Sequence, residues 1–223
     1  MRLSEQEAAD LLTHGDPIAL GREADAERRR RFGDTVTFIV DRNINYTNIC
    51  VNECRFCAFY TKQDAPDAYL LPMEEILAKV GETAAAGGTQ VMIQGGIHPD
   101  LPLSYYENML RSIRERYPSI VIHSFTATEI LYFAQKEGIT VEDTLRRLQD
   151  AGLASLPGGG AEILVDRVRR LIAPKKIMTE DWLRVMRTAH KIGMESTATM
   201  VIGFGETMAE RVEHMEHIRR LQE

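Results

Sequence analysis

The 223-residue chain has little that would place it in a membrane or on nucleic acid. No window approaches the roughly 18 apolar residues of a membrane span, and the polar N-terminus does not resemble a secretory signal. Acidic residues outnumber basic ones by 33 to 27, and a formal net charge of −6 argues against nonspecific binding to nucleic acid or anionic membranes. We therefore expect an ordinary globular protein of the cytoplasm, with no nucleic-acid and no membrane partner.

Cysteine is also scarce. The chain has 3 cysteines, and Cys50, Cys54 and Cys57 follow one another with the spacing C-x3-C-x2-C. An odd number cannot all pair in internal disulfides, and three thiolates so close can converge on a soft metal centre. A four-iron cluster held by three thiolates keeps one iron open, whereas a structural zinc would need a fourth protein ligand. Three unrelated buried cysteines are the remaining alternative.

Strand-like and helix-like segments alternate after residue 35. Strands are expected at residues 37–45, 89–94, 120–125, 153–156 and 196–202, and predicted helices separate and follow them. This alternation predicts the α/β class, with a parallel sheet and right-handed crossovers. An open doubly wound sheet and a barrel both fit the pattern. In either fold ligands bind at the carboxyl ends of the strands, where the glycine-rich segments of this chain lie.

Residues 1–34 are expected to form an N-terminal helical extension, and residues 35–223 the main domain. A capping box at residues 4–7 predicts the first helix, and Asp16-Pro17 predicts the start of the second. The main domain has only five strand–helix units, and its last predicted helix has no stop signal. We therefore expect it to end before a barrel closes, with an unpaired edge on the fifth strand.

The cysteine motif also carries a resemblance. An aromatic residue, Phe56, precedes its last cysteine, and this pattern resembles the signature of the radical S-adenosylmethionine (SAM) superfamily. The runs 45–50 and 54–60 are similar to the group that contains two menaquinone-pathway enzymes and the deazaflavin-forming FO synthases. The resemblance implies a radical SAM-type (β/α) barrel, truncated after the fifth strand–helix unit. It also implies a 4Fe-4S cluster held by the three cysteines, bound SAM, and an electron donor such as flavodoxin or ferredoxin.

The resemblance implies SAM contacts for several residues around the cluster. Phe56 and Tyr60 would lie beside the SAM adenine or ribose. Gln94, Gly95 and Gly96, after the second strand, resemble the glycine-rich element that binds the SAM amino group. The physical need for glycine there is a backbone that approaches the ligand closely. A simple strand-to-helix turn is the alternative for this element.

Two charged residues follow the fourth strand. Glu162 lies in the unusual run 157–163, in which three glycines precede a carboxylate. We expect Glu162 to bind the SAM amino group or the ribose hydroxyls. Arg167 is expected to bind the SAM carboxylate, because a guanidinium pairs naturally with a carboxylate. The alternative for Arg167 is a solvent-exposed helix residue.

Three further residues are candidates for substrate contact. Ser124 and Thr126 fall on the same face of the third strand, and with Glu129 they could reach substrate hydroxyls. Glu129 could instead be an acid at a helix start. His98 could transfer a proton at the mouth of the site, but a structural turn with Asp100 as a cap is the preferred interpretation.

Three other stretches narrow the resemblance to the cyclase family of the futalosine route to menaquinone, namely residues 90–96, 173–176 and 198–203. The implied enzyme converts dehypoxanthine futalosine, a small nucleoside-derived substrate, to its cyclic form. The 5′-deoxyadenosyl radical would remove the C4′ hydrogen of the ribose, and the ring would close on the benzoate. Aminofutalosine synthase or an FO synthase subunit is the alternative within the group. A non-catalytic, zinc-stabilised binding domain is the alternative from a different class.

Overall fold

The computed structural model describes residues 3–223. The strands are β1 (Asp41–Ile44), β2 (Gln90–Ile93), β3 (Val121–Ser124), β4 (Ser155–Leu156) and β5 (Glu195–Ser196). The helices are α1 (Glu5–His14), α2 (Pro17–Phe32), α3 (Met73–Ala85), α4 (Leu103–Arg116), α5 (Ala127–Glu137), α6 (Val141–Ala151), α7 (Asp166–Ile172), α8 (Thr179–Lys191) and α9 (Met208–Gln222). Strands and helices alternate along the chain after residue 40, as the sequence predicts.

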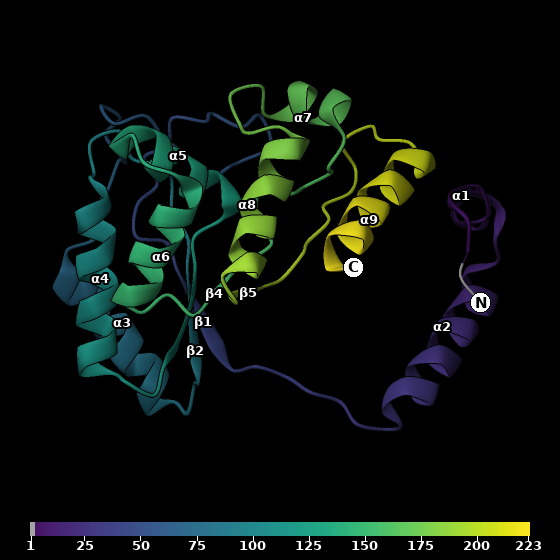
Figure 1. Cartoon of the computed structure of the whole chain (residues 1–223), viewed down its shortest axis with the longest axis horizontal. Coiled ribbons are helices and arrows are strands. Elements are labelled where there is room, and N and C mark those ends of the chain that lie inside the picture. Colours follow the sequence, from purple (N-terminus) through teal and green to yellow (C-terminus); the bar gives the residue numbers. More distant parts are fainter. Residues whose placement is uncertain (1–2) are drawn as a thin grey trace.

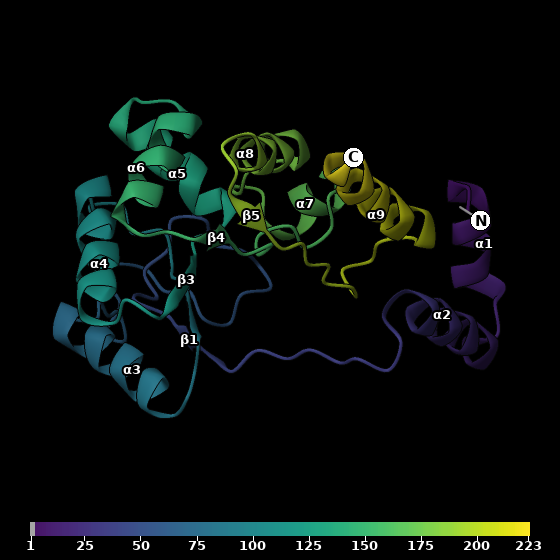
Figure 2. The same cartoon turned by 60° about the horizontal axis from the view of Figure 1, so that its bottom comes forward.

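The five strands form one sheet in the order β1-β2-β3-β4-β5, and every neighbouring pair is parallel. The order never reverses, so the sheet lacks the switch point of an open doubly wound fold. Helices α3, α4, α6 and α8 follow one another in an arc outside the strands (Figure 2). The barrel-type prediction is thereby confirmed. Within residues 3–223 the sheet stays open, with β1 and β5 as its outer strands.

A hydrophobic core joins the sheet to the outer helices. Ile93 of β2 and Leu156 of β4 are fully buried, as are Tyr106 and Met109 of α4. Trp182 closes the core under α8, where it is 1% exposed. Burial differs between the strands: β2 and β3 are largely covered, whereas most residues of β1 and β5, the outer strands, are at least partly exposed. The core therefore fixes the strand ends from which the site loops emerge.

All five strands are shorter than predicted, the first and the fifth by most, and two helices were missed. Residues 37–40 form no strand, and Phe38 there is 85% exposed. Residues 197–202 leave the sheet after Ser196, and Ile202 is 53% exposed. High β-propensity makes a strand only where a neighbour completes the hydrogen-bond ladder. The missed helices are α5 and α7, where the sequence analysis considered a helix only as the alternative for Glu129 and for Arg167.

The two N-terminal helices lie beyond α9, away from the sheet (Figure 1). Helix α1 packs beside α9, and Arg220 of α9 donates to Glu5 of α1 at 3.0 Å. No residue of α2 is buried. An extended segment that starts after α2 leads back to β1 (Figure 1). The helical extension is thus present, while the domain boundary at residue 34 stays a prediction.

Helix α9 is attached to the loop after β4 through a buried histidine. The backbone N–H of Leu164 donates to Nδ1 of His214 at 3.0 Å, and His214 is 2% exposed. Burial, followed by the neighbouring charges of His217 and Arg169, lowers the pKa of His214 to about 4. The imidazole is therefore neutral at pH 7 and can accept this hydrogen bond.

We predict that replacing His214 with Leu lowers the free energy of unfolding by about 1–3 kcal/mol, because the Leu164 N–H loses its acceptor. His214→Asn keeps an acceptor near Nδ1 and should lose less. The pKa of the histidine falls from its ordinary 6.5 to about 4 on folding. Its contribution to stability is therefore present above pH 6.5 and is lost as the pH falls toward 4. Urea titrations between these pH values should show a steeper loss in wild type than in His214→Asn. Equal pH dependence in the two proteins would refute this role.

Candidate functional site

The cysteine loop follows β1 and is fixed by backbone hydrogen bonds. The N–H of Cys57 donates to the carbonyl of Cys54 at 3.1 Å, and Glu53 between the first two cysteines has a φ of 46°. The N–H of Arg55 donates to the carbonyl of Ile172 at 2.8 Å. The loop therefore turns tightly and rests on the end of α7.

The glycine pair after β2 touches this loop directly. The N–H of Gly96 donates to the carbonyl of Thr47 at 2.8 Å. A Cβ on Gly96 would collide with the carbonyl of Ile49, and a Cβ on Gly95 would lie 2.6 Å from the ring of Tyr46. Glycine is required at position 96 because the backbones of the two loops are in contact, and at position 95 because the buried ring of Tyr46 fills the space of a side chain. A simple strand-to-helix turn, the alternative for this element, does not account for the close contact between the glycine pair and the cysteine loop.

The two loops enclose a cavity of about 240 Å³, which we call the cysteine cavity. It lies at the carboxyl ends of β1 to β4, the edge at which ligands bind in such folds. Eleven predicted site residues line it: Cys50, Cys54, Cys57, Phe56, Tyr60, Gln94, Gly95, Gly96, Thr126, Glu129 and Glu162. Residues from four separate parts of the sequence are thus brought to one place.

The donor set of the cavity fits an iron–sulfur cluster. Cys50, Cys54 and Cys57 line it together, and burial raises the pKa of the Cys54 thiol to about 11. A thiol must lose its proton to bind metal. Because burial disfavours the thiolate of Cys54, a bound metal has to stabilise that thiolate. Within the described residues, no three His, Cys, Asp or Glu side chains converge on a single metal ion. A cluster does not require that convergence, because each thiolate binds a different iron.

Glu129 lies behind the glycine pair with all its acceptors in use. One carboxylate oxygen accepts from the hydroxyl of Tyr46 at 3.1 Å and the N–H of Gly95 at 3.4 Å. The other accepts from the N–H and hydroxyl of Thr126 at 2.7 and 2.9 Å. Burial raises the pKa of Glu129, while these four donors lower it. The residue is thus part of the α5 capping box, and it also holds Gly95 in place.

A second buried carboxylate, Glu162, faces two cations. The ammonium of Lys176 donates to Glu162 at 2.7 Å, and the guanidinium of Arg169 lies 3.6 Å from its other oxygen. The backbone of Glu162 has a φ of 42°, outside the usual range for a non-glycine residue. Arg169 holds this turn, because it donates to the carbonyls of Gly160, Ala161 and Ile177.

Three predicted site residues lie outside the lining of the cysteine cavity. Arg167 points to α9, where it makes a two-bond ion pair with Glu210 at 2.7 Å. The guanidinium of Arg167 is therefore occupied by this ion pair. The prediction that Arg167 binds the SAM carboxylate needs correction. Ser124 is fully buried, and its hydroxyl has no partner among the described residues. His98 accepts from the N–H of Asp100 at 3.2 Å, as the structural-turn alternative expects.

The cavity also contains polar residues that sequence reasoning did not select. They are Asn45, Asn52, Thr128 and Lys176. The hydroxyl of Thr128 is buried without a partner among the described residues, and Lys176 is the only cation in this described lining. Lys176 follows Glu162 by fourteen positions, and no motif joins them in the sequence. Only the turn made by α7 brings them together.

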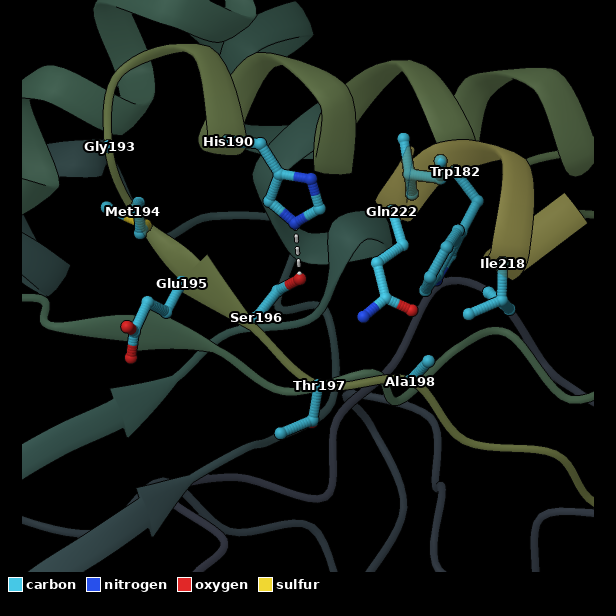
Figure 3. Close-up of a pocket in the computed structure, with 11 residues that line it drawn as sticks. Trp182, His190, Gly193, Met194, Glu195, Ser196, Thr197, Ala198, Ile218 and Gln222 are labelled. Carbon is cyan, nitrogen blue, oxygen red and sulfur yellow. Dashed lines mark hydrogen bonds between the residues drawn. The ribbon is translucent and has the colours of Figure 1, made fainter. Parts of the chain in front are cut away.

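A larger hollow of about 580 Å³ lies along the outer edge of β5, between α8 and α9 (Figure 3). His190 and Ser196 face each other there, with Nε2 2.8 Å from the hydroxyl oxygen. It contains no cysteine and none of the glycine loops after the strands. We therefore place the chemistry in the cysteine cavity.

The fold and site define a class of protein. A parallel (β/α) sheet carries three clustered cysteines at its carboxyl edge, facing a glycine loop, and this is the arrangement of an enzyme built around an iron–sulfur centre. The radical SAM superfamily model matches residues 44–218. The chain therefore belongs to the radical SAM superfamily, whose members use a 4Fe-4S cluster and SAM.

Several relatives carry enzyme names. A cyclic dehypoxanthine futalosine synthase from Streptomyces coelicolor is 46% identical over all of this chain and 57% of its own length. One from Halalkalibacterium halodurans is 43% identical over all of this chain and 60% of its own. A 5-amino-6-(D-ribitylamino)uracil–L-tyrosine 4-hydroxyphenyl transferase from Cyanothece sp. is 42% identical over 99% of this chain and 60% of its own. The chain thus spans about three fifths of the length of these relatives.

Solved structures agree on the fold. Methylornithine synthase PylB superimposes with a TM-score of 0.76 at 17% identity, over 99% of this chain and 62% of its own. The [FeFe]-hydrogenase maturase HydG superimposes with a TM-score of 0.74 at 19% identity, over 99% of this chain and 48% of its own. In the described part of the chain, no helix combines the length and apolar character of a membrane span.

We predict that Gly96→Ala prevents assembly of the cysteine cavity, because a methyl group there meets the carbonyl of Ile49. Iron bound after anaerobic reconstitution should fall to less than about half of the four irons of a complete cluster. Gly21→Ala is the matched control: Gly21 lies in α2 with no atom within 4 Å of an added Cβ. That variant should keep its iron and gain about 0.5–1 kcal/mol of stability. Full iron in Gly96→Ala would show that the loops need not touch.

Proposed function

We propose that this chain is the cluster- and SAM-binding part of a cyclic dehypoxanthine futalosine synthase in menaquinone biosynthesis. The observation that carries the proposal is the cysteine cavity in a chain 46% identical to an enzyme of that name. When bound, the cluster and SAM supply the radical chemistry that removes the C4′ hydrogen of the substrate ribose and leads to ring closure on the benzoate. This chain's own residues bind, orient and shield the reactants.

Cys50, Cys54 and Cys57 are the proposed cluster ligands. Their common loop presents the three sulfurs to one cavity, and the fourth iron would remain open for SAM. Phe56 is 38% exposed at the cavity and stacks near Phe204, with ring centroids 5.1 Å apart. These aromatic side chains would limit water access to the cluster, which protects a reactive radical.

Residues that line the cysteine cavity are the proposed SAM contacts. Gly95 and Gly96 offer their backbone to the SAM amino group, and Gln94 lies beside them. Tyr60 and Phe56 would contact the adenine or ribose, and Glu162 would accept from the amino group or ribose hydroxyls. Glu129 would act as a positioning residue through the N–H of Gly95.

The proposed enzyme needs an electron donor and a reducing compartment. An electron donor such as flavodoxin or ferredoxin would reduce the cluster, and the exposed ring of Phe59 on the cysteine loop gives such a protein a point of approach. An oxygen-sensitive cluster suits a reducing compartment, so we propose a cytoplasmic enzyme.

A second candidate reaction has support of its own. Relatives at 42% identity are named as 5-amino-6-(D-ribitylamino)uracil–L-tyrosine 4-hydroxyphenyl transferases. The anaerobically reconstituted, reduced protein should therefore be given dehypoxanthine futalosine in one reaction, and tyrosine with 5-amino-6-(D-ribitylamino)uracil in another. We expect the cyclic product in the first and none in the second. The reverse result would assign the transferase reaction.

We predict that Cys54→Ala abolishes cluster binding and SAM cleavage while leaving the fold intact, because Cys54 is a small side chain at the edge of the core. Iron per chain should fall from about four to below one. Cys54→Ser is the matched control for volume and should fail in the same way, because a hydroxyl is a poor ligand for iron–sulfur clusters. Circular dichroism should match that of wild type. Reductive SAM cleavage by Cys54→Ala would refute the ligand assignment.

A further inference from the structure

One face of the sheet carries a mostly polar row of side chains, which we call the inner row. The register of the strands places its members side by side: Asn43, Met92, His123, Ser155 and Glu195. Side chains alternate along a strand, and Ile44, Ile93 and Leu156, which follow three members of the row, are buried in the core against the helices. The inner row therefore points to the opposite face, away from the helices outside the strands (Figure 2).

The inner row lies one layer below the cysteine cavity. Asn45 and Gln94 come two positions after the row on the chain of β1 and β2, so they share its face, and both line the cavity. Two residues of a strand span about 7 Å. A ligand that enters the cavity and extends down this face of the sheet therefore meets His123, the one buried member of the row.

One ring nitrogen of His123 is held and the other is free. Nδ1 lies 2.7 Å from the hydroxyl oxygen of Ser155, while Nε2 has no partner among the described residues. Burial lowers the pKa of His123, and Asp41 of β1, the charged group that faces it, acts in the opposite direction without reversing the shift. Glu195 stands two strands further along the inner row. The imidazole is therefore neutral at pH 7. When Nδ1–H donates to Ser155, Nε2 keeps a free lone pair.

The other candidates for proton transfer are occupied. Glu129 accepts four hydrogen bonds, and Glu162 is paired with the ammonium of Lys176. His98, which the sequence analysis considered for proton transfer, accepts from a backbone N–H of its own turn and lies outside the cavity lining. Within the described cavity lining and the inner row, His123 is thus the only neutral nitrogen base with an unused lone pair.

We propose that Nε2 of His123 accepts the proton that the benzoate ring loses on ring closure, and that Ser155 holds the imidazole in position. This role rests on the function proposed above and deepens it. Ring closure joins two carbons that each carry one hydrogen. The first hydrogen leaves C4′ as an atom taken by the SAM-derived radical, so the second leaves the benzoate ring as a proton and an electron. The proton goes to Nε2, and the electron returns to the oxidised iron–sulfur cluster that supplied one for SAM cleavage.

The test measures two products of the anaerobically reconstituted, reduced protein with SAM and dehypoxanthine futalosine. 5′-Deoxyadenosine reports removal of the ribose hydrogen, and the cyclic product reports the later loss of the ring proton. Wild type should form the two in nearly equal amounts. Its rate of cyclic product should fall as the pH drops below the pKa of His123, because a protonated imidazole accepts no further proton.

His123→Gln keeps a polar side chain of similar size and removes the base. The rate of cyclic product should fall about 100-fold or more, as for loss of a general base, while 5′-deoxyadenosine still forms. The ratio of 5′-deoxyadenosine to cyclic product should rise more than about tenfold, and the decline at acid pH should disappear. Iron content and the affinity for SAM, measured by isothermal titration, should not change. His190→Gln makes the same change at an exposed position on α8 and should behave like wild type.

Ser155→Ala tests the positioning role. It removes the hydroxyl that holds Nδ1, so kcat should fall about tenfold at unchanged KM, as expected for the loss of one hydrogen bond. Ser155→Thr keeps a hydroxyl at this position and should restore most of the rate.

The outcomes separate this role from the proposed function. Absence of cyclic product from wild type overturns the proposed function and the role of His123 together. Cyclic product from wild type, with an unchanged product ratio and acid decline in His123→Gln, overturns the role of His123 alone. Loss of iron or of the fold in His123→Gln, with wild-type kinetics in Ser155→Ala, assigns His123 to structure and also overturns the role.

Discussion

The site depends on one close contact, the backbone approach of the glycine loop after β2 to the cysteine loop after β1. Gly96 donates to Thr47, and the carbonyl of Ile49 occupies the space that any side chain at position 96 would need. The contact exists because β1 and β2 are parallel neighbours whose carboxyl ends reach the same edge. Both loops must then pack with no side chain between them. The cysteine cavity, proposed to hold the cluster and SAM, lies where the two loops separate.

Two buried carboxylates support this edge in different ways. Glu129 is surrounded by neutral donors and ties α5 to Gly95, so it acts on the ligand through the backbone of the glycine loop. Glu162 is surrounded by cations and sits at a strained turn that Arg169 holds. Glu129 therefore fixes the backbone of the glycine loop, whereas Glu162 holds the ammonium of Lys176 at the cavity. The same residue type thus serves two purposes at one edge.

Much of the fold was predictable because its signals are local. Alternating strands and helices, and glycines after the strands, lie in short stretches of sequence, and the sheet follows from them. Segments 37–40 and 197–202 were predicted wrongly as strand, because their apolar residues lack a neighbouring strand to pair with. Glu129 was predicted to contact substrate hydroxyls; its capping box with Thr126 is visible in the sequence, whereas its hydrogen bond with Gly95 is not.

By itself the sequence determined the three-cysteine motif, the parallel (β/α) class and the glycines that follow the strands, because spacing and side-chain type suffice for each. The tertiary structure decided which basic residue faces the cavity. Arg167 and Lys176 are equally plausible from their positions, yet α7 turns Arg167 toward Glu210 and returns the chain so that Lys176 meets Glu162. Charge pairing between distant residues depends on the path of the chain in space, and no local pattern records that path.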